Sequence, residues 1–247
     1  MPALTKFDQV KHTAARLRSA ILCGEFAVNT ALPDAQSIAN ENNVTEQIVR
    51  EAFRDLQALN LVEILPDGRA VVQQWRRSGE LPILPYFFLE SPDPAEKASV
   101  VEELLHIRRV VLGEAAAQAA EHALADDLRR LDECIEAMRV YRGDTHRLVL
   151  LDLDFHEYLL DASHSLSVRW MANSLIRVYR EFIHRYPGIW RLSHDHFTYL
   201  QELMTALRGG DPEETRAVVQ RHLETSDQIV SAMVRMYAKG IWKPVIE

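Results

Sequence analysis

The chain has 247 residues, of which 47% are hydrophobic and 26% are charged. This composition supports one large core or two modest ones and argues against a disordered chain. It contains only 9 glycines and 10 prolines, which favours a helix-rich protein. The net charge of −8 excludes a general polycation. Any contact with nucleic acid must therefore come from a local patch.

The sequence carries no sign of export or of a membrane span. Cys23 and Cys134 are too few for a disulfide framework and lack zinc-ligand spacing. The first 30 residues contain no signal-peptide core, and no stretch approaches the roughly 20 apolar residues of a spanning helix. We therefore expect a cytoplasmic protein with no membrane partner.

Prolines divide the chain into three expected parts. Four of the ten prolines lie between residues 76 and 97, and proline biases its own backbone and the preceding residue away from helix. We predict a first domain over residues 1–75, an extended or irregular proline-rich linker over 76–97, and a second domain over 98–240.

In the first domain, apolar residues recur every three or four positions over residues 7–21, which predicts a helix. Asp34 is expected to cap a short second helix and Thr45 a third. The segments 62–65 and 70–73 then predict a β-hairpin, because a turn sequence separates two short apolar runs. Three helices followed by a two-stranded wing form a winged helix-turn-helix.

Beyond residue 98, apolar stripes with a 3.6-residue period run through six segments, and strand alternation is lacking. These stripes predict helices at 98–122, 124–142, 145–163, 166–186, 190–209 and 212–238. Helices of this length form an antiparallel bundle. The expected fold is therefore mainly α, with an N-terminal winged helix-turn-helix (three helices plus a β-hairpin) followed by an antiparallel six-helix bundle.

The third predicted helix opens with side chains suited to reading DNA. In a helix-turn-helix, this helix enters the major groove with its first residues at the base edges. Gln47 can pair with adenine, Arg50 with guanine or phosphate, and Thr45 can hold a phosphate at the helix N-terminus. Further candidates are the phosphate contact Arg54 and the wing-tip residues Gly68 and Arg69, which could enter the minor groove.

Charge leaves an alternative open for this domain. Residues 1–75 hold seven basic and nine acidic side chains, a net charge of −2, so the domain should bind random DNA weakly. Glu46 could accept a hydrogen bond from a cytosine amino group, but in the wrong place it would repel the DNA backbone. A winged domain used only for protein contacts would have the same layout.

A run of residues through the second and third predicted helices carries a family signature. It comprises Leu32-Pro33, Val44-Thr45, Val49-Arg50-Glu51-Ala52, Leu56, Leu59 and Leu61-Val62. This run resembles the GntR family of bacterial transcription regulators. The resemblance implies DNA binding through Thr45, Arg50 and the wing at Gly68. Gln36 and Glu46 stand where the family usually has DNA-contacting arginines, which implies an atypical operator or weaker binding.

Three predicted helices of the bundle carry Asp or His on the stripe that faces the core. Asp152 and His156 lie four residues apart on one helix, and His196 and His222 lie on two others. A carboxylate and an imidazole so placed can ligate one metal ion. The alternative is a buried Asp–His hydrogen-bonded pair, with the other histidines bonded to backbone carbonyls. The residues alone leave both open.

A second set of residues spans the bundle. It comprises Ile107-Arg108, Asp152-Leu153-Asp154-Phe155-His156, Ala162-Ser163, Ala206-Leu207, Gly210-Asp211 and His222. Over residues 98–236 the chain is similar to the FCD effector domain of FadR-type regulators. The resemblance implies a divalent metal (zinc, nickel or manganese) held by one Asp and three His, beside a pocket for a small organic acid that Arg108 clamps. The alternative role of Arg108 is a buried salt bridge to a neighbouring helix.

The resemblance places Asp152, His156 and His222 on three of the four ligand positions. The fourth position is Leu200, and His196 lies one turn earlier on the same face as a possible substitute. Without that substitution, the resemblance implies three protein ligands plus water or effector.

These patterns predict a ligand-responsive bacterial transcription regulator that binds a pseudo-palindromic operator as a homodimer and is not an enzyme. One alternative is a metal-independent regulator that senses acyl-CoA or another metabolite. The other is a metal-dependent hydrolase with Asp154 or His164 as general base. The sequence offers no nucleophile elbow, P-loop, dinucleotide fingerprint or HExxH motif.

Overall fold

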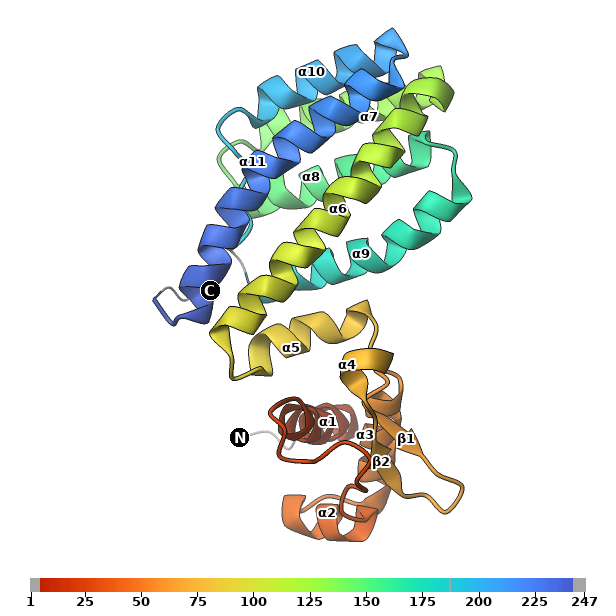
Figure 1. Cartoon of the computed structure of the whole chain (residues 1–247), viewed down its shortest axis with the longest axis vertical. Coiled ribbons are helices and arrows are strands. Elements are labelled where there is room, and N and C mark those ends of the chain that lie inside the picture. Colours follow the sequence, from red (N-terminus) through yellow and green to blue (C-terminus); the bar gives the residue numbers. More distant parts are fainter. Residues whose placement is uncertain (1–4, 187, 242–247) are drawn as a thin grey trace. The chain divides into compact units, whose positions relative to one another are not determined.

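A computed structural model describes residues 5–186 and 188–241. It divides into two compact units, the first ending at Pro92 and the second beginning at Asp93. The first holds three helices and a two-stranded hairpin, and the second is helical (Figure 1). The predicted fold class is confirmed. None of the helices in the described ranges combines the length and apolar character that crossing a membrane requires.

The first unit begins with three capped helices, α1 (Lys6–Leu22), α2 (Ala35–Asn42) and α3 (Glu46–Gln57). The side chains of Thr5, Asp34 and Thr45 each accept a hydrogen bond from a backbone N–H of the following first turn. Asn43 ends α2 with a left-handed backbone, φ 54°. This conformation produces the tight turn into α3.

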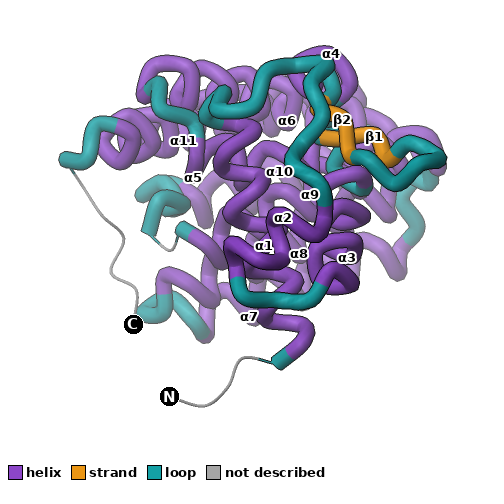
Figure 2. Tube along the Cα trace, turned by 90° about the horizontal axis from the view of Figure 1, so that it is seen from below, coloured by secondary structure: helices purple, strands orange, loops and turns teal. Residues whose placement is uncertain are grey.

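A short antiparallel hairpin of β1 (Val62–Ile64) and β2 (Ala70–Val72) completes the fold of the helix-turn-helix (Figure 2). Val62 pairs with Val72 and Ile64 with Ala70. Residues of the hairpin and of all three helices form one apolar core: Leu17, Ile21, Leu22, Leu32, Ala35, Ile38, Ala39, Val49, Phe53, Leu56, Leu61, Val62, Ala70 and Val72. This core fixes the wing beside α3.

The expectation of an extended linker over residues 76–97 is wrong. The chain there forms a short helix α4 (Trp75–Ser78), a 3₁₀ turn at Leu81–Ile83 and the helix α5 (Leu84–Glu90). The 3₁₀ turn, α5 and the next helix each carry a proline at one of their first two positions. Proline is compatible with a first turn because the N–H it lacks would have no intrahelical partner there.

Within its described residues, the second unit consists of six helices: α6 (Pro94–His122), α7 (Ala125–Val140), α8 (Thr145–Ala162), α9 (Leu166–Arg185), α10 (His196–Gly209) and α11 (Pro212–Ala238). The two longest, α6 and α11, pack along each other, as the yellow-green and blue ribbons of Figure 1 show. Gly113 of α6 lies at this contact, because a Cβ atom added there would stand 3.0 Å from Nε2 of Gln220 on α11.

One helix boundary in this unit differs from the prediction. The apolar stripe from residue 190 predicts a helix there, but α10 begins only at His196. Gly188 has φ +88° and the segment up to Asp195 is irregular. Its apolar residues, Ile189 and Trp190, are buried without being helical. Burial alone therefore produces the pattern that resembles a helical stripe.

Candidate functional site

The predicted DNA-reading residues of α3 lie on the surface of the first unit. Thr45, Gln47 and Arg50 are exposed, while Ile48 and Val49 face the core. This separation follows from the helical period, because the core-facing residues alternate with the polar ones at helical spacing. The start of α3 is therefore open to a partner. Gln36 on α2 and Arg54, one turn further along α3, are exposed as well.

Several of these polar side chains hold one another in weak exposed contacts. Nη2 of Arg50 lies 3.0 Å from Oε2 of Glu46, and Nε2 of Gln47 donates to Glu51 over 3.4 Å. Exposed pairs of this kind contribute little to stability, so a DNA phosphate or base can replace them. Arg54 makes no ion pair with any residue in the described part of the chain.

The wing tip lies directly beside α3, the recognition helix, which is expected to enter the major groove. Gly68 has φ +86°, and a Cβ atom added there would stand 3.2 Å from Nη1 of Arg50. Arg69 pairs with Asp67, its Nε lying 2.7 Å from Oδ2. Glycine at position 68 thus satisfies a left-handed turn and leaves room for the Arg50 guanidinium.

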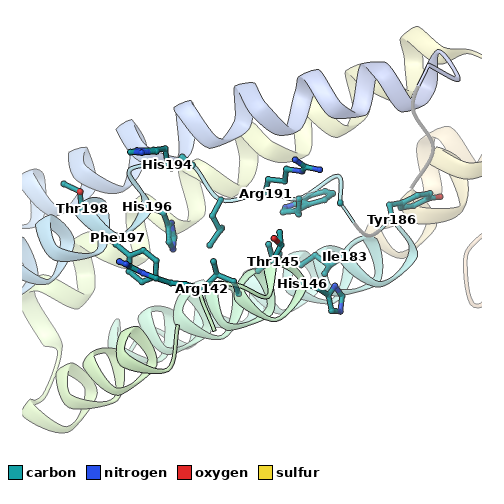
Figure 3. A pocket seen from close by; sticks show the side chains of 16 residues that line it. Arg142, Thr145, His146, Ile183, Tyr186, Arg191, His194, His196, Phe197 and Thr198 are labelled. Atoms are coloured by element: carbon teal, nitrogen blue, oxygen red, sulfur yellow. The ribbon is translucent and has the colours of Figure 1, made fainter. Parts of the chain in front are cut away.

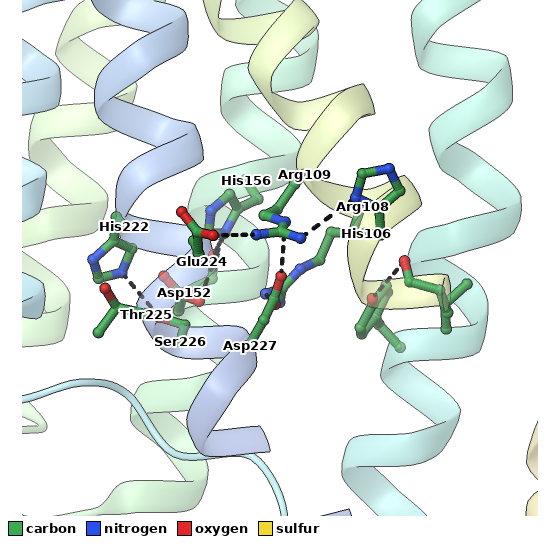
Figure 4. A network of polar contacts seen from close by, with 12 residues as sticks. His106, Arg108, Arg109, Asp152, His156, His222, Glu224, Thr225, Ser226 and Asp227 are labelled. Carbon is green, nitrogen blue, oxygen red and sulfur yellow. Dashed lines mark hydrogen bonds and ion pairs between the residues drawn. The ribbon is translucent and has the colours of Figure 1, made fainter. Parts of the chain in front are cut away.

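In the second unit, the four residues singled out as metal ligands come together inside the bundle. Asp152 and His156 are on α8, His196 begins α10 and His222 is on α11. Nε2 of His196 lies 3.3 Å from Oδ1 of Asp152. Nδ1 of His156 is hydrogen-bonded to the backbone carbonyl of Asp152 over 2.7 Å, as the alternative to a metal site expects of a histidine, and lies 3.6 Å from Oδ2 of the same residue. Nδ1 of His196 lies 3.3 Å from Nε2 of His222. Figure 4 shows Asp152, His156 and His222 within one polar network.

Burial sets the charge states of this cluster. Desolvation lowers the pKa of His222 to about 4, with a further contribution from His196, and lowers the pKa of His196 too. Burial opposes ionisation of Asp152, but the three histidines and Arg108 outweigh it and lower its pKa. The cluster therefore holds the ionised carboxylate of Asp152 beside the neutral imidazoles of His196 and His222, the protonation states in which these groups bind metals.

The unpaired atoms of the cluster show which chemistry it fits. Oδ1 of Asp152, Nε2 of His156, Nε2 of His196 and Nδ1 of His222 are buried and make no hydrogen bond in the described structure, although Oδ1 of Asp152 and Nε2 of His196 face each other at 3.3 Å. Such atoms fit the donor set of a divalent transition metal. As they stand, however, no three His, Cys, Asp or Glu side chains among the described residues are arranged to hold an ion. The donor chemistry fits, whereas the present positions do not converge on one point.

Arg108 forms a buried salt bridge to a neighbouring helix, the alternative to its role as an effector clamp, and sequence reasoning missed only the partner residue. Nη2 of Arg108 donates to Oδ1 of Asp227 on α11, and Nε of Arg109 lies 3.2 Å from Oδ2 of the same carboxylate (Figure 4). Burial raises the pKa of Asp227 despite these two cations. The sequence contains a signal for this residue, because Asp227 falls between Leu223 and Val230 on the buried stripe of α11 and a buried carboxylate needs a partner.

A small cavity of about 50 Å³, which we call the inner cavity, lies against both Arg108 and the histidine cluster. Arg108, Asp152 and His156 contribute to its wall, together with Tyr179 and Trp190. Tyr199 was also missed by sequence reasoning. Its ring stacks on that of His222 with a centroid distance of 3.6 Å and an interplanar angle of 1°, which fixes the plane of the imidazole.

The bases considered for an enzyme both have polar partners of their own. Asp154 lies 3.4 Å from Nη2 of Arg180, and Nε2 of His164 lies 2.8 Å from Oδ2 of Asp127. The His164–Asp127 pair joins the end of α8 to the start of α7 and has a structural role. Neither base is hydrogen-bonded to the histidine cluster in the described structure.

Comparisons with known proteins agree with this division. The family model described as bacterial regulatory proteins, gntR family, matches residues 9–72, and the FCD domain model matches residues 103–225. The HTH-type transcriptional regulator Mce2R of Mycobacterium tuberculosis is 26% identical over 221 residues, which cover 87% of this chain and 88% of that protein. The galactonate operon transcriptional repressor of Escherichia coli is 24% identical over 185 residues, covering 74% and 77%.

Among solved structures, the fold is similar to that of Lar, described as controlling expression of the Listeria monocytogenes agr system. The TM-score is 0.57 and the sequence identity 16%, over 90% of this chain and 95% of that one. At this identity, the likeness concerns the fold.

Proposed function

Because the chain belongs to the GntR family of bacterial transcription regulators and carries an FCD effector domain, we propose that it binds a pseudo-palindromic DNA operator as a homodimer and that a small organic acid controls this binding. The observation that carries the proposal is the exposed start of α3, with Arg50 beside the wing tip at Gly68. In a dimer, two such surfaces would read half-sites about one helical turn apart.

The DNA-binding part is tested with an operator selected from a random duplex library by the purified full-length protein. We expect Arg50→Ala to weaken binding to that operator at least tenfold, because one lost base or phosphate contact is worth about 1–3 kcal/mol in each subunit. Arg129→Ala is the matched control, since Arg129 is an exposed arginine of the second unit. Equal affinities of Arg50→Ala and the wild type would contradict the proposed interface.

For the second unit, we propose that Asp152, His156, His196 and His222 hold a divalent cation, zinc, nickel or manganese. The unpaired donor atoms support this, and a modest movement of the side chains would be required. When bound, the cation would supply a Lewis-acid centre for the carboxylate of the effector. Leu200 is fully buried and supplies no ligand at the fourth position of the family pattern.

Elemental analysis of protein purified without an affinity tag tests the metal. We expect close to one equivalent per chain in the wild type and a loss in His156→Ala, while the exposed His106 provides the control variant His106→Ala. Less than about half an equivalent in the wild type would favour the metal-independent regulator. The positions of the four side chains, which do not converge on one point, support that alternative.

An acidic effector is supported by Arg108, whose guanidinium lies in the wall of the inner cavity with Asp152 and His156. One relative, the galactonate operon repressor, is named for the operon of a sugar acid. An acid that reaches Arg108 must share or replace its ion pair with Asp227. To act as a switch, the acid must also prefer one arrangement of the protein over the other.

A thermal-shift screen of small carboxylates, with and without added zinc, tests the effector, because native-state ligands raise the melting temperature. We expect His156→Ala to retain operator binding and to lose most of the response to the acid. A full response in that variant would show that the effector acts without the histidine cluster, and would contradict this part of the proposal.

A further inference from the structure

A second and much larger cavity lies in the helical unit, with a volume of about 770 Å³. It is lined on one side by the turn between α7 and α8 and the first residues of α8, and on the other side by the segment between α9 and α10 (Figure 3). We call it the outer chamber. His196 forms part of its wall, and Val149, Ile183 and Trp190 line both the outer chamber and the inner cavity at Arg108. The two spaces therefore adjoin each other.

The charge of the outer chamber is one-sided. The charged side chains of its described lining are Arg142 and Arg191, and this lining includes no Asp or Glu. Three histidines, His146, His194 and His196, add polar ring nitrogens. The two arginines are a marked local excess of positive charge in a chain whose net charge is −8. A cavity lined by one sign of charge concentrates ligands of the opposite sign.

The two arginines of the outer chamber are available to a ligand. Arg142 stacks on the ring of Phe197, its guanidinium carbon 4.3 Å from the ring centroid. Neither Arg142 nor Arg191 forms an ion pair with another residue in the described part of the chain. Arg108 differs, because its charge is already matched by Asp227.

Two helix starts add to this field. The residues Thr145 and His196, which line the chamber, are the first of α8 and α10, and the N-terminus of a helix carries a partial positive charge. The N-cap carboxylates of the same helices, Asp144 and Asp195, offset part of it. The two unpaired guanidiniums are therefore the main attraction for an anion.

We propose that the outer chamber binds a second anionic group of the effector, so that the effector carries two anionic groups. One carboxylate reaches the inner end, at Arg108 and the histidine cluster, and a second carboxylate or a phosphoryl group lies with Arg142 and Arg191. A volume of about 770 Å³ accommodates a six-carbon sugar acid. This inference rests on the proposed effector site in the helical unit.

Three acids with one carbon skeleton test it: gluconate, with a single carboxylate, glucarate, with two, and 6-phosphogluconate, with a carboxylate and a phosphoryl group. Their dissociation constants are measured by calorimetry on the full-length protein. We compare the wild type with the double variant Arg142→Gln/Arg191→Gln. The control is Arg177→Gln/Arg221→Gln, which neutralises two exposed arginines outside the chamber.

We expect glucarate or 6-phosphogluconate to bind the wild type at least tenfold more tightly than gluconate, and the better of the two identifies the second group. The preference should vanish in Arg142→Gln/Arg191→Gln and persist in the control. Equal binding of all three acids, a preference that survives in the chamber variant, or no binding of any acid would overturn the inference. Operator binding is measured separately by gel shift. Failure of the acid-binding experiment therefore leaves the proposed DNA-binding function untouched, and that function is tested by the gel shift alone.

Discussion

The ion pair between Glu46 and Arg50 makes an unusual prediction, namely that removing an acidic residue improves DNA binding. The two side chains lie 3.0 Å apart and are about half exposed. The bare Coulomb attraction at this distance in water is about 1.4 kcal/mol. Measured values for exposed pairs one helical turn apart are smaller, about 0.3–0.5 kcal/mol, because side-chain entropy and salt reduce them.

In Glu46→Gln, Arg50 no longer has to leave this partner to contact DNA. With two recognition helices in a dimer, the gain is about 0.6–1 kcal/mol, a three- to fivefold lower dissociation constant. Loss of the carboxylate's repulsion toward the phosphates acts in the same direction. Fluorescence anisotropy on the selected operator measures the change, and the gain should be absent when Arg50→Ala is already present.

The opposite result would be informative. If Glu46→Gln binds the operator several-fold more weakly, Glu46 reads a base directly, as a cytosine amino group would require. The reasoning from the ion pair would then be refuted. A melting temperature of free Glu46→Gln that differs from the wild type would mark an effect on DNA binding through the stability of the protein. The variant Thr205→Gln, at an exposed position of α10, shows how much a surface substitution alone changes the melting temperature.

The remaining predictions concern stability and are measured by urea unfolding. Thr45→Ala should destabilise the first unit by about 1 kcal/mol, because Thr45 caps α3. Asp227→Ala should cost about 3–5 kcal/mol by leaving Arg108 buried without its partner, whereas the joint replacement Arg108→Met/Asp227→Leu should cost much less. In metal-free protein, the lowered pKa of His222, about 4, means that the unfolded chain takes up a proton first as the pH falls. Stability should then decrease by about 2 kcal/mol between about pH 7 and pH 5, and constant stability over this interval would contradict a buried neutral imidazole.

The sequence predicted most of the first unit because its signals are local. Thr45 and Asp34 act as caps through their own side chains, and Gly68 meets the demand of a tight turn. These requirements involve neighbours in the chain, so they can be recognised without a structure. The conformation of residues 76–97 was missed because proline was treated only as a helix breaker. Pro85 and Pro94 instead occupy first turns.

In the helical unit, periodicity placed His156, His196 and His222 on inward faces, and the structure brings them together. Periodicity does not give the rotation and depth of one helix against another. The pairing of Arg108 with Asp227, which are 119 positions apart, depends on how α6 packs along α11. The outer chamber was missed for a related reason. Arg142 and Arg191 stand near the ends of predicted helices, whereas in the structure both lie in non-helical chain outside α7 and α10.

The closeness of Gly68 to Arg50 has a consequence for the operator itself. A wing that moves to follow a narrower or wider minor groove shifts the space available to the guanidinium, because only 3.2 Å separates it from a Cβ position at the tip. Base pairs read in the two grooves should then contribute to affinity non-additively, in contrast to well-separated positions. A table of single-base preferences would underestimate how strongly this regulator distinguishes intact half-sites from sites altered in both grooves.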